Sequence, residues 1–386
     1  MCIRDSYPSC GALVATAQAA LSGAVPSGVR HRISRAVGRR AWHRRRRGLS
    51  RLTRRSSLVL TITATVLSAV LLVAAVLVAR DGGAPADPAA PAVLAAANHA
   101  VRIDPATYEP DASVAVGTNP AAVAGGGGLV WVASRDGTVT VIDPGTNRVQ
   151  ETLPASGSGP VGQGGPGLAF ASGSLWVANT DQGQVARAAL DTDATPITVG
   201  ASPIALAAAP DADIVWVAGR TQSGGGLLAR IDARTNQVDS TIPLRHAPSG
   251  LAVAVDGGTV WTVTTKDRTL RSFDTRTGDP GKPVKLRLTP DQVVLGDGAV
   301  WVTSTSRDTV LRIDPATSKA KEIRVGNGPS GLAFGADRVW VANGLDGTVS
   351  AIDPQTNDVA TRRLGFRPAA VAVVAEQRAV WVTLAA

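Results

Sequence analysis

The sequence predicts an all-β protein in which residues 97–386 form a closed seven-bladed β-propeller. Trp recurs seven times in this region, at intervals of 39 to 45 residues: Trp131, Trp176, Trp216, Trp261, Trp301, Trp340 and Trp381. An apolar residue followed by Asp recurs seven times as well: Asp104, Asp143, Asp191, Asp232, Asp274, Asp314 and Asp353. A period near 40 residues is typical of solenoids and propellers, and the strands within each unit decide between them.

Each unit contains four short runs with the pattern of strands. Between residues 248 and 288 these runs are PSGLAV, TVWTV, TLRSFD and KPVKLRL, separated by Gly, Asp, Pro and Thr. They are apolar or alternate between apolar and polar residues, and none has the period of a helix. Four antiparallel strands in about 40 residues make one propeller blade.

The two ends of the repeat region predict how the ring closes. The region begins at AVRID, 100–104, which matches a third strand, and stops at AVWVT, 379–383, which matches a second strand. The seven Trp strands and the seven Asp strands can pair only if two strands from each end of the region share the seventh blade. Such closure removes the free sheet edges of an open array.

The two repeated markers have structural interpretations. We expect the Trp side chains to pack between blades, where each buries on the order of 200 Å². We expect the Asp of the I-D-P-x-T-N turn to accept hydrogen bonds from backbone N–H groups of its own turn. Calcium binding there is a weaker alternative, because calcium needs several converging oxygen ligands and each turn offers one acid.

The N-terminal part of the chain differs sharply in composition. Residues 1–56 contain thirteen Arg and one acid, Asp5, so the rest of the chain is mildly acidic although the whole carries +9. This distribution argues against nucleic-acid binding by the large domain. Cys2 and Cys10 are the only cysteines, so no disulfide is expected in the propeller.

Residues 57–79 form a run of 23 residues without charge, which predicts a transmembrane helix and exceeds the usual apolar core of a signal peptide. The Arg residues on its N-terminal side place the N-terminus in the cytoplasm and the propeller outside the plasma membrane. Residues 80–96, rich in Ala, Pro and Gly, are expected to form a linker. The Arg-rich run 39–55 is expected to rest on anionic lipid headgroups, with a nucleic-acid contact as the alternative.

The repeats resemble a known family. Residues 97–386, with SGLAF…VWVANGLDGTVSAIDPQTN as the closest copy, resemble YVTN-type β-propeller repeats, including those of virginiamycin B lyase and of surface-layer-like propellers. The lyase resemblance implies a His/Glu constellation with magnesium at the propeller centre. Here the outer domain offers only His99 and His246, and its few Glu residues occupy no matching blade positions.

Other catalytic patterns are missing from the sequence as well: it has no G-x-S-x-G, no Walker A and no CxxC motif. We therefore expect no catalytic residue, no metal site and no cofactor in this chain, and regard it as a non-enzyme.

A second resemblance lies at the N-terminus. YPSCGALVATAQAAL, residues 7–21, resembles the last helix of bacterial Ser/Thr protein kinase domains, and the first six residues, MCIRDS, resemble translated sequencing adaptor. Together they imply that the natural protein begins upstream and that the chain is the C-terminal part of a receptor-type kinase.

The leading functional hypothesis is a membrane-anchored sensor or scaffold that binds an envelope ligand or a protein. Binding is expected on the face formed by the turns between second and third strands and the connections between blades. These loops contain the candidate ligand-binding residues Arg135, Asn179, Arg220, Lys266, Arg307 and Asn343, and the acids Asp136, Asp181, Asp267 and Asp308. A homodimer bridged by ligand is one way such a sensor could signal. The alternatives are an extracellular lyase-like enzyme and the sensor of a non-kinase, DNA-binding membrane regulator.

Overall fold

The computed structural model describes residues 95–154, 167–190, 192–208, 213–253 and 258–386. The chain divides into two units, Met1–Asp87 and Pro88–Ala386, and the description below concerns the second. The basic segment 1–56, the expected helix 57–79 and nearly all of the linker 80–96 lie outside the described residues. Within the described part of the chain, no helix has the length and apolarity that a membrane crossing requires.

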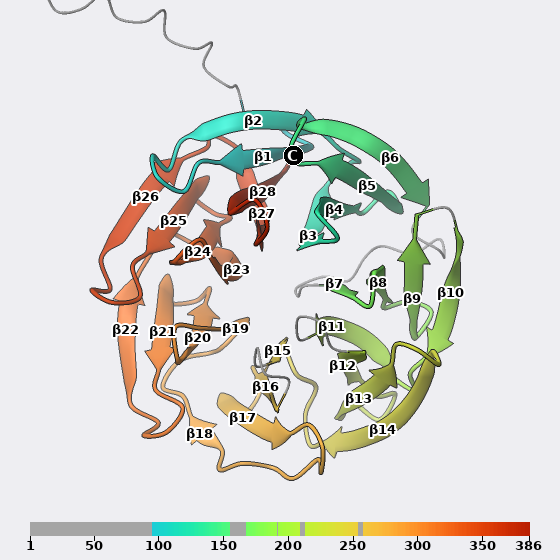
Figure 1. Ribbon diagram of the computed structural model, residues 1–386. Helices are drawn as coiled ribbons and strands as arrows, with labels where there is room; N and C mark the ends of the chain where they lie inside the picture. Colours follow the sequence, from blue (N-terminus) through green and yellow to red (C-terminus); the bar gives the residue numbers. More distant parts are fainter. Residues whose placement is uncertain (1–94, 155–166, 191, 209–212, 254–257) are drawn as a thin grey trace, which may run out of the picture. The chain divides into compact units, whose positions relative to one another are not determined.

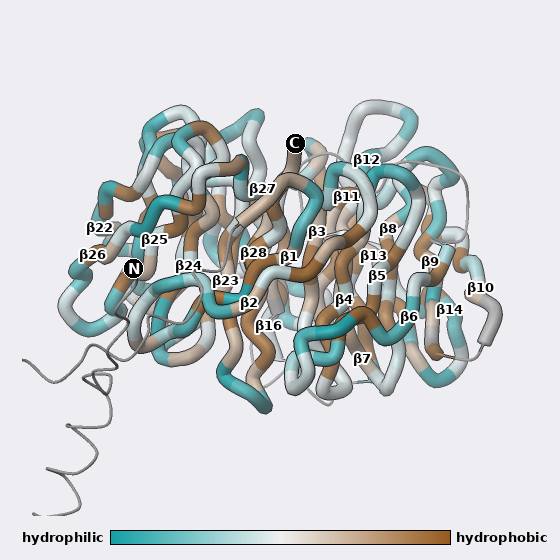
Figure 2. Tube along the Cα trace, turned by 90° about the horizontal axis from the view of Figure 1, so that it is seen from above, coloured by the Kyte–Doolittle hydropathy of each residue, from teal (hydrophilic) through white to brown (hydrophobic). Residues whose placement is uncertain are grey.

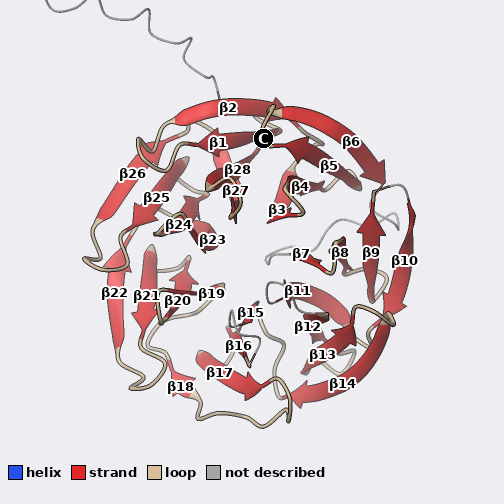
Figure 3. Ribbon diagram, in the orientation of Figure 1, coloured by secondary structure: helices blue, strands red, loops and turns tan. Residues whose placement is uncertain are grey.

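In the described part of the chain, twenty-eight strands form seven four-stranded antiparallel sheets, arranged as the blades of a ring (Figure 1). Across the residues that the structure describes, the chain consists of strands, turns and loops without a helix (Figure 3). The predicted all-β, seven-bladed fold is thereby confirmed.

The strands occupy four concentric positions. The innermost are β3 (Pro120–Gly126), β7 (Leu168–Ala171), β11 (Ser202–Ala208), β15 (Gly250–Val253), β19 (Val293–Gly296), β23 (Pro329–Gly335) and β27 (Arg367–Val374). The second are β4 (Leu129–Ser134), β8 (Ser174–Asn179), β12 (Ile214–Arg220), β16 (Thr259–Thr264), β20 (Ala299–Ser304), β24 (Arg338–Asn343) and β28 (Ala379–Ala385). The third are β1 (His99–Ile103), β5 (Thr138–Asp143), β9 (Gln184–Ala189), β13 (Gly226–Asp232), β17 (Thr269–Asp274), β21 (Thr309–Ile313) and β25 (Thr348–Ile352). The outermost are β2 (Pro110–Ala115), β6 (Arg148–Pro154), β10 (Thr192–Thr198), β14 (Gln237–Leu244), β18 (Val284–Lys285), β22 (Ala320–Arg324) and β26 (Val359–Arg363).

The ring closes with strands from both ends of the repeat region. One sheet has the order β2-β1-β28-β27, and β1 pairs antiparallel with β28 so that Val101 lies opposite Val382 and Ile103 opposite Val380. Segments at the two ends of the repeat region therefore build one blade, as the strand counts predicted. The pairing removes the free edges that β1 and β28 would otherwise expose.

The Trp side chains lie at equivalent places between blades. Six are buried and Trp261 is half-buried. Each packs against second-strand residues of the following blade; Trp301, for example, shares a cluster with Val339 and Val341. Four also donate an indole N–H hydrogen bond to the carbonyl five residues earlier in their own hairpin: Trp131, Trp176, Trp301 and Trp340. The packing role predicted for Trp is confirmed.

The tight hairpin turns form at residues that tolerate a positive φ angle. The hairpin between β19 and β20 turns at Asp297 and Gly298, with φ of 51° and 67°. Positive φ at both central residues is the geometry of a type I′ turn, which matches the twist of the flanking strands.

The third-to-fourth-strand turns are closed by their Asp, as expected. Asp314 Oδ1 accepts from the N–H groups of Ala316 (2.8 Å) and Thr317 (3.0 Å), and the Ser318 N–H donates to the Asp314 carbonyl. Equivalent side-chain bonds occur at Asp104, Asp143, Asp232, Asp274 and Asp353. Asp191 lies outside the described residues. The capping interpretation thus holds at all six described turns.

An arginine on the third strand joins several blades to the next Asp turn. Arg187 lies opposite Trp176, stacks over its ring at 5.4 Å and donates to Asn236 Oδ1 (2.9 Å) in the turn of the following blade. Arg312 reaches Asn357 Oδ1 in the same way. Arg102 donates to the Pro144 carbonyl of the next turn. We call this contact the Arg–turn clasp.

Candidate functional site

One face of the propeller gathers the turns between second and third strands and the connections between blades. We call it the connection face. The turn 134–138 and the connection 116–119 belong to it, and the C-terminal residue lies on it too, on the upper side of the ring in Figure 2. The other face, with the Asp turns, is called the turn face.

A cavity of about 440 Å³ opens on the connection face, at the mouth of the central channel. Its lining comes from four consecutive blades, with Arg135 and Arg367 as the charged side chains and Gln292 and Ser330 as further polar groups. The described lining residues include no Asp or Glu, although the last residue, Ala386, brings its main-chain carboxylate to the lining. A cavity of this size is within the range of small-molecule or peptide-anchor sites, and its side chains favour an anionic or hydrogen-bond-accepting group.

Hydrogen bonds between blades hold the rim of this cavity in place. The hydroxyl of Ser330 donates to the Pro368 carbonyl of the next blade (3.0 Å), and Gln292 Nε2 donates to the Ser330 carbonyl (2.5 Å). In another blade, Ser249 donates to the Pro290 carbonyl. These hydrogen bonds join neighbouring blades at the points where their innermost strands begin, next to the cavity or further around the channel.

The acids of the connection face bind backbone groups of the scaffold. Asp136 accepts from the Thr118 N–H (2.5 Å) and from the N–H and hydroxyl of Thr138, tying its turn to the blade connection. Partial burial raises the pKa of Asp136, but the hydrogen bonds from Thr138 and Thr118 outweigh it and hold that pKa below its ordinary value. Asp308 accepts from the Gly328 N–H in an equivalent way.

The predicted cations lie on the surface. Arg135, Arg220, Lys266 and Arg307 are all exposed, and none forms an ion pair with another described residue. Arg135 lines the channel-mouth cavity, whereas the other three stand on separate blades outside it. The structure therefore brings one of the four to the cavity.

The two predicted amides lie inside the blades. Asn343 is fully buried and donates to the hydroxyls of Thr348 (3.0 Å) and Ser350 (2.9 Å). Asn179 is buried and accepts from the Gln182 N–H. Both side chains close the turn after a second strand, so they belong to the scaffold and not to an exposed recognition surface.

Sequence reasoning missed two exposed apolar side chains in loops of the connection face. Leu345 and Phe366 are 70% and 39% exposed, and Phe366 precedes the cavity residue Arg367. The Leu364 N–H donates to the Gly347 carbonyl, which ties the connection holding Phe366 to the turn holding Leu345. A large apolar residue in a loop is the signal that could have identified them.

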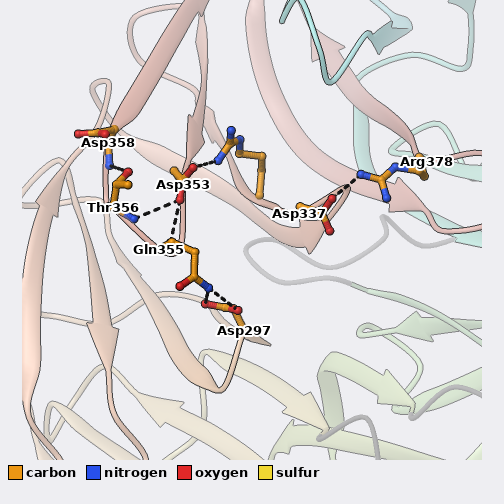
Figure 4. A network of polar contacts seen from close by, with 8 residues as sticks. Asp297, Asp337, Asp353, Gln355, Thr356, Asp358 and Arg378 are labelled. Atoms are coloured by element: carbon orange, nitrogen blue, oxygen red, sulfur yellow. Dashed lines mark hydrogen bonds and ion pairs between the residues drawn. The ribbon is translucent and has the colours of Figure 1, made fainter.

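The turn face has its own cavity, of about 640 Å³, where side chains from three consecutive blades meet (Figure 4). Asp337 pairs with Arg378 (2.5 Å), Arg338 pairs with Asp353, and Gln355 Nε2 donates to both carboxylate oxygens of Asp297. Each of these acids has a partner inside the network. The arrangement interlocks the blades.

The two histidines of the described residues, His99 and His246, lie in different blades that are not neighbours. His99 begins β1 and its Nδ1 lies 2.9 Å from the Ala97 carbonyl. His246 follows β14 and lines a cavity of about 310 Å³ with Asp267 and Arg271. Within the described residues no three His, Cys, Asp or Glu side chains are grouped as a metal site would require.

Comparisons with known proteins find likeness in fold. No protein-family model matches the sequence, and no curated protein matches it. A streptogramin B lyase structure is 15% identical with a TM-score of 0.58, over 69% of this chain and 91% of that one. Virginiamycin B lyase from Staphylococcus aureus is 14% identical with a TM-score of 0.56, over 69% and 94%. Kuenenia stuttgartiensis hydrazine synthase is 14% identical with a TM-score of 0.58, over 69% and 96%. At these identities the likeness establishes a propeller fold similar to that of the lyases, and leaves activity to be argued from the residues.

Proposed function

We propose that this chain is the binding part of a membrane-anchored sensor or scaffold, and that its propeller recognises an envelope ligand or protein on the connection face. The observation that carries the proposal is the channel-mouth cavity: Arg135 and Arg367 line it, and Phe366 and Leu345 are exposed in loops of the same connection face. Arg and large aromatic side chains beside a preformed pocket are the residues that dominate binding energy at protein interfaces.

The anchor and the effector in this proposal rest on the sequence. The uncharged run 57–79 supports a single crossing, and the Arg residues before it support a cytoplasmic N-terminus with the propeller outside. The resemblance of residues 7–21 to the end of a kinase domain supports a Ser/Thr protein kinase as the cytoplasmic effector. Binding that bridges two propellers would bring two effectors together.

The proposal assigns no catalysis to the propeller. The purified full chain in detergent is assayed against envelope fractions, with and without magnesium, for binding and for turnover. We expect saturable binding without turnover. Turnover abolished by His246→Ala would contradict the assignment.

Variants locate the binding surface. Arg135→Ala together with Arg367→Ala removes both cavity cations and should weaken binding at least tenfold, the loss of about 1.4 kcal/mol. The double variant Lys266→Ala, Arg307→Ala, which leaves the cavity cations in place, tests whether the wider face contributes. Arg148→Ala with Arg234→Ala, two exposed cations away from this cavity, is the control and should bind normally. Equal losses in the control and cavity variants would contradict a site at the channel mouth.

A further inference from the structure

The outer rim of the propeller has a strongly uneven charge. The segments 275–288, 315–325 and 354–364, which contain the outermost strands β18, β22 and β26, together hold nine Lys and Arg and three acids. The four corresponding segments of the other blades, 105–115, 144–154, 192–199 and 233–244, hold two Arg and five acids. The three cationic segments belong to consecutive blades and lie side by side along the perimeter (Figure 1). We call them the basic arc.

The cations of the arc are accessible. All nine are exposed. Among described residues one of them, Arg362, forms an ion pair, with Glu109 at 3.0 Å, and Lys285 donates to the Asp267 carbonyl. Most of these cations therefore have no ion-pair partner among the described residues.

The Lys residues are also distributed unevenly along the chain. The chain has five Lys among its 39 basic residues, and all five lie between Lys266 and Lys321. Four of them belong to the arc: Lys282, Lys285, Lys319 and Lys321. Lys presents a compact, hydrated point charge on a flexible stem, whereas Arg supplies the planar fork suited to fixed pairs such as the Arg–turn clasp.

We propose that the basic arc binds a linear phosphate polymer. A curved row of mobile point charges across three blades matches repeating negative charge along a chain, and release of counterions would drive the association. A protein partner fits less well, because Lys is depleted at protein interfaces and the exposed large apolar side chains of the described residues, Val149, Leu345 and Phe366, lie outside the three segments. The arc is separate from the channel-mouth cavity, so this binding is independent of the function proposed above.

The lysines themselves give the readout. The purified full chain in detergent is acetylated with an amine-reactive ester in the presence of long-chain polyphosphate or poly(glycerol phosphate), and modification of each Lys is followed by mass spectrometry. Because all Lys lie between residues 266 and 321, acetylation reports on this part of the propeller and on no residue of the Arg-rich segment 1–56. We expect Lys282, Lys319 and Lys321 to be protected several-fold by one or both polymers, with protection abolished at high salt.

Substitutions then separate the arc from general charge effects. The variant Lys319→Gln, Lys321→Gln, Arg324→Gln removes the central part of the arc and should abolish protection of Lys282. It should also lower the slope of log affinity against log salt by about 2, since each neutralised phosphate adds roughly 0.7 to that slope for a single-stranded polymer. The control Arg148→Gln, Arg234→Gln, Arg245→Gln removes the same charge elsewhere and should leave both unchanged.

The proposal is overturned if neither polymer protects the arc lysines, whether or not duplex DNA does. It is also overturned if the control triple variant reduces protection as much as the arc variant. The variant Arg135→Ala with Arg367→Ala should retain protection, which keeps this result distinct from the channel-mouth site.

Discussion

At the scale of single residues, the Trp of each second strand combines blade packing with a local hydrogen bond. Trp301 is fully buried, shares a cluster with the next blade and donates to the Gly296 carbonyl at 2.9 Å. We predict that Trp301→Ala lowers the free energy of unfolding by about 3–5 kcal/mol, since it leaves a large cavity. Urea unfolding of the purified chain measures this. Trp261→Ala, at the half-buried equivalent position, is the comparison and should cost less; an equal or larger loss would contradict the packing account.

The Asp turn caps predict how stability depends on pH. Hydrogen bonds from backbone N–H groups hold the pKa of Asp143, Asp232, Asp274 and Asp314 below the ordinary value of 3.8. Because their pKa is lower in the folded state, the unfolded state binds more protons as the pH falls, and stability decreases in that range. We expect a constant urea midpoint from pH 7 to about 5 and a decline below about pH 4. Asp314→Asn retains an oxygen acceptor without titrating, so its decline should be shallower; an unchanged slope would show that this cap does not contribute.

At the scale of elements, the Arg–turn clasp joins neighbouring blades where both partners are present. Arg187 bonds to Asn236, whereas Arg230 lies 3.7 Å from Asp239 of its own blade. The Asp turn of the blade after Arg230 has Gly278 at the position of Asn236. We predict that Arg187→Ala and Asn236→Ala are coupled by about 1 kcal/mol in a double-mutant cycle of unfolding free energies. Arg187→Ala with Asn357→Ala, whose positions belong to different clasps, should be additive. Additivity of the first pair would mean that the bond contributes nothing.

Sequence reasoning predicted the blades well because each weak strand signal occurs seven times. The Trp and Asp positions and the two half-blades all agree with the sheet order. The clasp was missed because its partners, such as Arg187 and Asn236, are 49 residues apart and meet only after neighbouring blades pack. Asn343 was assigned to the surface, but it is the buried last residue of β24. The sequence alone does not show whether a polar residue at this boundary ends the strand or begins the exposed turn. Phe366 was overlooked because connections between blades do not repeat regularly.

At the scale of the whole molecule, closure through β1 and β28 predicts that the last strand is essential. Ending the chain at Arg378 removes β28 with Trp381 and leaves β1 and β27 without their shared partner. We expect this variant to lose cooperative thermal unfolding and to aggregate, because unpaired strand edges template association. Circular dichroism and size-exclusion chromatography detect both. Removal of Ala386 alone is the control and should have no effect; a monomeric, cooperatively folding truncation at Arg378 would contradict closure.

The central claim is that the propeller meets its partner on the connection face beside the channel mouth. The most direct measurement is site-specific photo-crosslinking in cells that produce the full chain, with a benzoyl-phenylalanine placed at Phe366 or, as the control, at Val149. Both positions are exposed and apolar, and Val149 lies on the outermost strand β6. We expect a discrete cross-linked envelope component from position 366 that disappears when Arg135 and Arg367 are replaced by Ala, and none from position 149. Cross-linking from 149 but not from 366, or from neither, would contradict the account.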